Sequence, residues 1–228
     1  RERIAAWVGA PRTPLLFGAA GEAGADYLNS AFFVRPSKAG EPAWARYDKV
    51  HLVPYGESVP FKRLFPLLKR MVEARGGGEY LPGTAMPLFR VGGARFGALI
   101  CFESTLPGLA RQYARSGADF LIVMTNDAWF LKSTAPYQHA MQSSFRAMEN
   151  GLPVVRAANT GQTCAYDARG RLLASLPIYE EGVLTVEIQA EQRRTLYSRW
   201  GDFPIQLALG IVLGYFAGLF LMPKGVRY

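Results

Sequence analysis

The residues best suited to covalent chemistry lie in one short stretch, where Cys101 ends an apolar run and Glu103 follows two positions later. A thiol becomes a strong nucleophile only as the thiolate, so it needs a base or a cation close by. Alternation along a strand would place the side chains of Cys101 and Glu103 on the same side of the backbone. This pattern predicts a nucleophilic cysteine, and the alternative is a small buried hydrophobic residue.

Two charged residues upstream are candidates for the groups that a thiolate needs. Lys49 lies in an otherwise apolar, strand-like run, and lysine is seldom buried without a partner. Glu57 follows the turn formed by residues 54–56. The residue types alone leave two simpler interpretations open, a solvated lysine at a sheet edge and an ordinary carboxylate in a turn.

A loop rich in apolar side chains follows the strand predicted at 120–125. Loops at strand ends often carry functional residues. Exposing Trp129, Phe130 and Leu131 would be costly unless these side chains contact a substrate, a lipid or a partner. We therefore expect Trp129 and Phe130, together with Phe102 beside Cys101, to contact the substrate.

Metal and cofactor chemistry is not expected. The chain has two histidines, His51 and His139, and each is expected to be structural. No cluster of histidine, cysteine and carboxylate residues has the spacing of metal ligands. Two cysteines, Cys101 and Cys164, do not make a disulfide framework. A single bond between them would disable a Cys101 nucleophile.

The elements that must position these residues alternate between short β-forming runs and helical patterns, which predicts a layered α/β fold. A hairpin is expected at Gly92-Gly93. The strands are predicted at Leu15–Ala19, Ser30–Val34, Val50–Val53, Pro87–Val91, Phe96–Cys101, Phe120–Thr125, Pro153–Ala157 and Val183–Ile188.

Two helices are predicted between these strands. One covers residues 106–116 and ends before a glycine, and the other covers residues 136–150 and also ends before a glycine. Met141, Phe145 and Met148 recur at helical spacing in the second helix. We expect these three side chains in the core.

The end of the chain has the pattern of a membrane span. Residues 205–222 carry no charge, and Pro204 and Pro223 bracket them. Their length is near the minimum for crossing about 30 Å of hydrocarbon. The short basic tail after them predicts a cytoplasmic C-terminus, with the preceding domain outside the cytoplasm. Glycines at every fourth position of the span favour close packing with other membrane helices.

Composition restricts the class of protein further. The chain has 228 residues, half of them hydrophobic, and a formal net charge of +8. The basic residues are scattered instead of forming the stripe that nucleic-acid binding needs, so no nucleic-acid partner is expected. A basic surface beside a membrane span favours anionic lipid headgroups. Because the chain begins with what resembles the middle of a helix, we expect it to be the later part of a longer protein.

Residues 61–72 interleave lysine and arginine with leucine, phenylalanine and methionine, and three glycines follow at 76–78. This composition is typical of an amphipathic segment at a membrane surface. A surface helix packed on the domain is the alternative. The glycines suit a mobile hinge.

Taken together, these motifs resemble the nitrilase-like domain of the apolipoprotein N-acyltransferase family, within the nitrilase superfamily. The resemblance covers nearly the whole chain, the final helix included. It is carried by Tyr47–Lys49, Leu52–Glu57, Ile100–Glu103, Thr125–Phe130, Tyr137–His139, Arg146–Gly151 and Asn159–Gly161.

The resemblance implies an αββα sandwich with a Glu-Lys-Cys triad. By motif, Cys101 is similar to the nucleophile and Lys49 to the triad lysine, which would stabilise the oxyanion. Glu57 and Glu103 are similar to supporting carboxylates. None of the acidic residues before Lys49 stands in the motif of the triad glutamate, so we expect that base upstream of this chain. Those acidic residues are Glu2, Glu22, Asp26, Glu41 and Asp48.

The resemblance also implies a reaction, its partners and its place. A phospholipid would donate an acyl chain to Cys101, and the thioester would acylate the α-amine of a diacylglyceryl-cysteine apolipoprotein. The catalytic domain, residues 1–196, would face the periplasm. A linker at 197–204, a span at 205–222 in the bacterial inner membrane and a cytoplasmic tail at 223–228 would follow.

Two other hypotheses stay open at this point. A nitrilase-type amidase would use the same cysteine and lysine on a soluble C–N substrate, although it would need no membrane anchor. A membrane-anchored binding module would lack catalysis altogether.

Overall fold

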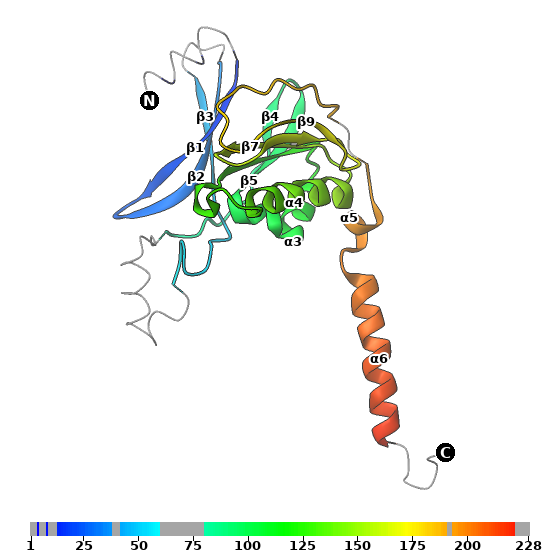
Figure 1. Cartoon of the computed structure of the whole chain (residues 1–228). Helices are drawn as coiled ribbons and strands as arrows, with labels where there is room; N and C mark the ends of the chain where they lie inside the picture. The colour runs from blue at the N-terminus through cyan, green and yellow to red at the C-terminus, as the bar shows by residue number, and fades with distance from the viewer. Residues whose placement is uncertain are drawn as a thin grey trace.

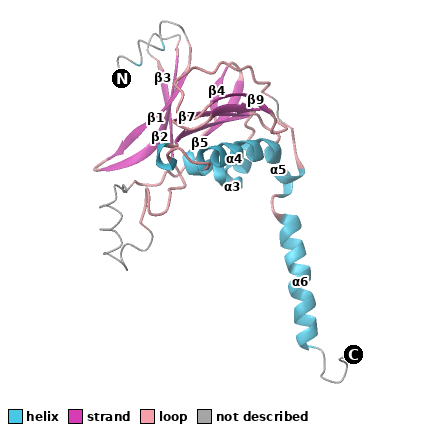
Figure 2. Cartoon of the chain, viewed as in Figure 1, coloured by secondary structure: helices cyan, strands magenta, loops and turns pink. Residues whose placement is uncertain are grey.

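Two β-sheets lie face to face in the computed structural model, and two helices cover the outer face of the larger sheet (Figures 1 and 2). The structure describes residues 13–37, 42–59, 80–190 and 193–221, together with Ile4 and Val8. The amphipathic segment at 61–72, the glycines at 76–78 and the C-terminal tail lie outside the described residues.

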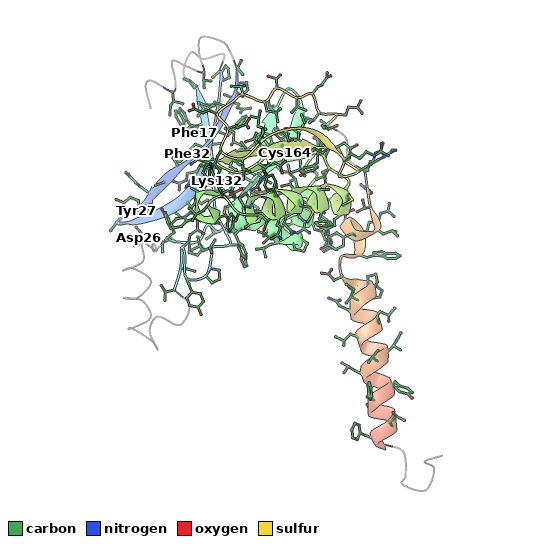
Figure 3. All side chains as sticks on the ribbon, viewed as in Figure 1. Phe17, Asp26, Tyr27, Phe32, Lys132 and Cys164 are labelled. Atoms are coloured by element: carbon green, nitrogen blue, oxygen red, sulfur yellow. The ribbon has the colours of Figure 1, made fainter. Side chains whose placement is uncertain are left out.

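The smaller sheet is an antiparallel meander of β1 (Leu15–Ala23), β2 (Asp26–Arg35) and β3 (Ala43–Asp48). Phe17 on β1 and Phe32 on β2 stack on one of its faces, with their ring centroids 5.6 Å apart (Figure 3). The opposite side chains of β2 point into the space between the sheets, where Phe33 contacts the larger sheet. Alternation along β2 therefore supplies one wall of the core.

The larger sheet has the strand order β4-β5-β6-β7-β8-β9, and β5, β6 and β7 are parallel to one another. The connections between these parallel strands contain α3 (Pro107–Arg115) and α4 (Ala135–Asn150). The strands are β4 (Phe89–Val91), β5 (Ala94–Ile100), β6 (Phe120–Asn126), β7 (Val154–Asn159), β8 (Thr163–Tyr166) and β9 (Leu172–Leu176).

Strand β5 is the centre of the fold because both of its faces are buried. Phe96 and Ile100 point toward the smaller sheet, and Leu99 points toward the helices. Gly97 lies against Tyr113 of α3, where the ring occupies the space that a Cβ atom would need. Continuous burial explains why this strand is an apolar run without polar alternation.

Two of the predicted strands are wrong. Val50–Val53 forms no strand, because the backbone N–H groups of Val50 and His51 bond to the Glu103 carboxylate. The strand in this region is β3, which ends just before Lys49. Val183–Ile188 also pairs with no strand within the described chain. The hairpin at Gly92-Gly93 is confirmed as the turn between β4 and β5.

The boundaries of both predicted helices agree with α3 and α4, but the predicted core face of α4 is wrong. Met141, Phe145 and Met148 are 40–48% exposed. The face of α4 that packs inward carries small and polar side chains, namely Pro136, His139, Ala140, Ser143, Arg146, Ala147 and Asn150. Small residues let the helix approach the sheet closely. The large apolar side chains, on which the prediction relied, therefore lie on the other face of the helix.

The chain ends in two helices. The short helix α5 (Leu196–Trp200) is held against α3 by Arg111, whose guanidinium donates hydrogen bonds to the carbonyls of Tyr197 and Arg199. Helix α6 (Phe203–Leu221) then projects away with its side chains pointing outward on all sides (Figure 3). By length and composition alone α6 could cross a membrane, and none of its apolar window is buried.

The contact between Gly97 and Tyr113 gives the first prediction. Replacing Gly97 with alanine places a methyl group in the Tyr113 ring, which is fully buried and has no room to move. We expect the free energy of unfolding to fall by about 1–3 kcal/mol. Chemical denaturation of both proteins measures the change.

Gly108→Ala in α3 is the matched control, because a Cβ atom there meets open space. We expect it to be neutral or slightly stabilising. If Gly97→Ala were equally harmless, the close packing of β5 against α3 would be contradicted.

Candidate active site

Cys101 stands at a sharp turn where β5 ends. It is the first residue of a short 3₁₀ helix, η1 (Cys101–Thr105), and its backbone φ of 53° lies in the left-handed region. A non-glycine residue held in this region costs roughly 1–3 kcal/mol unless its surroundings fix it. The side chain is half-buried and lines a cavity between the sheets. The turn therefore presents the thiol at the end of a rigid strand.

The predicted alternation of Cys101 and Glu103 is wrong, because the chain turns into η1 instead of continuing as a strand. Glu103 points inward and is fully buried. Its Oε1 accepts hydrogen bonds from Tyr47 Oη (2.7 Å), Val50 N (2.9 Å) and His51 N (3.0 Å). Its Oε2 accepts one from Ile100 N at 2.8 Å. Glu103 thus connects the end of β5 to the segment after β3.

Burial raises the pKa of Glu103, and the hydrogen bonds donated to both of its oxygens oppose that rise. Burial also raises the pKa of Tyr47, with a further contribution from the Glu103 charge, so Tyr47 stays a neutral donor. In all four contacts the partner donates and the carboxylate accepts, as an ionised glutamate requires. The position of Glu103 suits a structural support and places it behind the nucleophile.

Lys49 and Glu57 form a direct ion pair. The Lys49 ammonium is fully buried, and its Nζ lies 2.5 Å from Glu57 Oε2. The carboxylate of Glu57 also accepts hydrogen bonds from Val53 N at 2.8 Å and from Asn29 Nδ2 at 2.7 Å. The two charges are therefore fixed by the turn after Lys49 and by β2, and a solvated edge lysine is excluded.

The cavity beside Cys101 has a volume of about 790 Å³. Its lining includes Glu57, the end of β6 and the loop after it, whereas Lys49 reaches this space only through its ion pair with Glu57 and is not itself among the lining residues. Much of the wall is apolar, with contributions from Leu16, Phe17, Ala19, Ala20, Met124, Ala157, Ala158, Val183 and Leu184. Polar side chains, among them Asn126, Asn159 and Thr163, complete the wall.

The three predicted substrate contacts lie in different surroundings. Trp129 is 76% exposed and lines the cavity together with Cys101. Phe102 and Phe130 are not among the lining residues within the described part of the chain. Phe130 packs edge-to-face on His139, with the ring centroids 5.8 Å apart. Of the three, Trp129 is therefore placed best to meet a bound molecule.

Sequence reasoning missed two groups near the site. Asn29 supports Glu57, and no local motif marks it. Asp127 and Arg156 form a fully buried ion pair at 2.7 Å, next to His139. Burial would raise the pKa of Asp127, but hydrogen bonding to His139 and the Arg156 charge outweigh burial and lower it. For the buried ion pair, the available signal in the sequence was an arginine in the middle of the predicted strand 153–157, because a buried arginine needs a partner.

Cys164 lies on β8 and is fully buried among the strands (Figure 3). Both cysteines are free thiols, so the disulfide considered above is absent from the described chain. No group of three or more potential metal-binding side chains lies together within the described residues.

The Glu103 contacts give the second prediction. In Glu103→Gln, one oxygen becomes an NH₂ group, which faces an N–H or O–H donor in either orientation of the amide. A buried donor then loses its acceptor, and we expect the free energy of unfolding to fall by about 1–3 kcal/mol. Chemical denaturation measures the change.

Tyr47→Phe is the comparison, because it removes one donor and leaves the others paired with the carboxylate. Its loss should be smaller than that of Glu103→Gln. A Glu103→Gln protein as stable as the parent would show that these bonds do not hold the two segments together.

The comparison with known proteins agrees with this geometry. The profile of the carbon-nitrogen hydrolase family matches residues 4–197. Apolipoprotein N-acyltransferase of Geobacter metallireducens is 43% identical over 180 residues, which are 77% of this chain and 33% of that protein. The enzyme of the same name from Chlorobaculum tepidum is 36% identical and is matched over 94% of this chain and 43% of its own length. The chain thus spans roughly a third to two fifths of these relatives.

Among solved structures, an amidase from Nesterenkonia sp. AN1 carries acrylamide at its active-site cysteine. It superposes with a TM-score of 0.63 at 21% identity, over 91% of this chain and 74% of the amidase. This likeness concerns the fold and supports the nitrilase-like arrangement of sheets and helices. With a family profile that covers most of its length and a cysteine at the turn after β5, the chain belongs to the carbon-nitrogen hydrolase family.

Proposed function

We propose that this chain carries the acyl-transfer site of an apolipoprotein N-acyltransferase. The observation that carries the proposal is the cavity of about 790 Å³, in which the Cys101 thiol and Glu57 meet a wall that includes apolar side chains from both sheets. Such a wall suits an acyl chain better than a small amide. The names of the relatives support the same activity.

The first half of the reaction forms a thioester. A glutamate upstream of this chain takes the proton of Cys101, and the thiolate attacks the ester carbonyl of a phospholipid. Lys49 stabilises the resulting oxyanion by its charge. The tetrahedral intermediate collapses, and the lysophospholipid leaves with the proton held by the glutamate.

The second half transfers the acyl chain. The α-amine of a diacylglyceryl-cysteine apolipoprotein attacks the thioester carbonyl and loses a proton to the base, and an amide forms as the Cys101 thiolate leaves. Glu57 and Asn29 keep the Lys49 ammonium in place through both halves. Trp129, Phe102 and Phe130 are the proposed contacts for the substrates, and Trp129 lies nearest to the cavity.

Membrane attachment fits substrates that are themselves lipids. We propose that α6 spans the bacterial inner membrane, with the sheets on the periplasmic side and the C-terminus in the cytoplasm. The exposed side chains of Leu196, Trp200 and Phe203 at the start of this span suit the interface. Membrane helices upstream of this chain would pack on α6.

The third prediction concerns the nucleophile. In the natural full-length protein, Cys101→Ala should lower acyl transfer from phospholipid to a lipopeptide amine by roughly 10³-fold or more, because the covalent route is lost. The transfer assay uses a labelled phospholipid in detergent micelles. Unfolding of the variant is followed in parallel to show that the fold is intact.

Cys164→Ala is the matched control, since its thiol is buried on β8 and lies outside the cavity lining. It should retain transfer. A soluble amide offered in a second assay separates the alternative function. Hydrolysis of the amide with no transfer from phospholipid would contradict the proposal and favour an amidase.

A further inference from the structure

Three buried polar side chains form a hydrogen-bonded series directly behind Cys101. It begins at Asp127 after β6, passes through His139 on α4 and ends at Ser104 in η1. Asp127 and Ser104 are fully buried, and His139 is 7% exposed. Buried polar groups are nearly always hydrogen-bonded, because each one must find a partner to offset the loss of water.

The distances within this series are those of hydrogen bonds. His139 Nδ1 lies 2.9 Å from Asp127 Oδ1 and 3.1 Å from Arg156 Nη2. A carboxylate can only accept, so the bond to Asp127 requires the proton on Nδ1. On the other side of the ring, Nε2 lies 3.1 Å from Ser104 Oγ and 3.2 Å from the carbonyl oxygen of Cys101. Ser104 Oγ donates to that same carbonyl at 2.8 Å. The series therefore ends at the backbone carbonyl of the nucleophile.

Asp127 is itself held firmly. Thr125 Oγ1 donates to its Oδ1 at 2.9 Å, and Arg156 donates to its Oδ2 at 2.7 Å. Gly161 lies so close that a Cβ atom there would overlap the carboxylate. Phe130 covers one edge of the His139 ring. The imidazole consequently has one orientation, set from β6 and β7.

The contacted residue is the one that needs support. Cys101 has a left-handed backbone without being glycine, and such a conformation persists only where neighbouring groups fix it. Its carbonyl accepts a hydrogen bond from Ser104 Oγ, His139 Nε2 contacts both of these atoms, and the turn at the end of β5 aims the thiol into the cavity. Releasing the carbonyl would let the turn relax and the sulfur move away.

We propose that His139, oriented by Asp127, is a positioning residue that fixes the backbone of Cys101 and thereby aims its thiol at the acyl carbonyl. This role rests on the proposed function of Cys101 as the nucleophile. It assigns to His139 and Asp127 a part in the reaction without contact with the substrate.

Three variants of His139 in the natural full-length protein separate positioning from packing. Glutamine keeps an amide where Nε2 contacts Ser104 and Cys101, whereas asparagine keeps one only where Nδ1 contacts Asp127. Alanine removes both. The first readout is the rate at which iodoacetamide alkylates Cys101, quantified on its own peptide by mass spectrometry. The second is kcat and KM for acyl transfer.

We expect His139→Ala to slow alkylation and kcat by roughly 10- to 100-fold, with KM within about twofold of the parent, because misplacing a reacting atom by about 1 Å has this effect. His139→Gln should recover much of the rate, and His139→Asn should not. Ser143→Ala is the matched control, since Ser143 is buried one turn along the same face of α4 and its hydroxyl has no hydrogen-bond partner among the residues that the structure describes. It should change neither readout.

Equal rates for the glutamine and asparagine variants would overturn the proposal, as would a parental alkylation rate in His139→Ala. The proposal would also be overturned if the losses in alkylation rate and kcat were proportional to the fall in unfolding midpoint across the His139 and Ser143 variants. Such losses would indicate a role in packing alone. If His139→Ala slows alkylation while Cys101→Ala still transfers acyl chains, positioning holds and the proposed function fails.

Discussion

The carboxylate of Glu103 is the interaction on which the site depends. It accepts hydrogen bonds from the end of β5 in the larger sheet, from Tyr47 on β3 in the smaller sheet and from the segment after β3. Cys101 directly follows β5, and Lys49 directly precedes Val50 in the segment after β3. One buried carboxylate therefore bonds to the backbone neighbours of both groups. Because Glu103 turns inward to reach these donors, it faces away from the thiol although it is close to it in sequence.

The other supports of the site follow the same logic. Glu57 fixes the Lys49 ammonium from the turn that follows it, and Asn29 on β2 fixes Glu57. Asp127 and Arg156 form a second buried ion pair behind the turn at Cys101. Buried pairs of this kind add little net stability, and we infer that here they serve to fix the geometry around the site. In this protein they surround a half-exposed cysteine, which is the residue whose placement matters for chemistry.

The sequence predicted elements well where burial alone determines them. Residues 96–101 and 120–125 are apolar because β5 and β6 are buried on both faces, and glycines end both helices. Prediction failed where a side chain far along the chain takes the backbone bonds, as Glu103 does for Val50 and His51. It also failed on α4, whose buried face is small and polar. Of the site, residue types and motifs pointed to Cys101, Lys49 and Glu57. Asn29, which bonds to Glu57, and Arg156, which pairs with Asp127, could not be inferred, because only the fold brings these partners close.

The proposed function requires that Cys101 becomes covalently acylated. In the most direct measurement, the natural full-length protein is mixed with a phospholipid that carries an isotope-labelled acyl chain. The reaction is quenched with acid within one turnover, and the label is located by peptide mass spectrometry. The account predicts the acyl mass on the Cys101 peptide, its release by neutral hydroxylamine and its loss when a lipopeptide amine is added. Acyl transfer that proceeds while the Cys101 peptide stays unmodified, or a label found on Cys164, would contradict it.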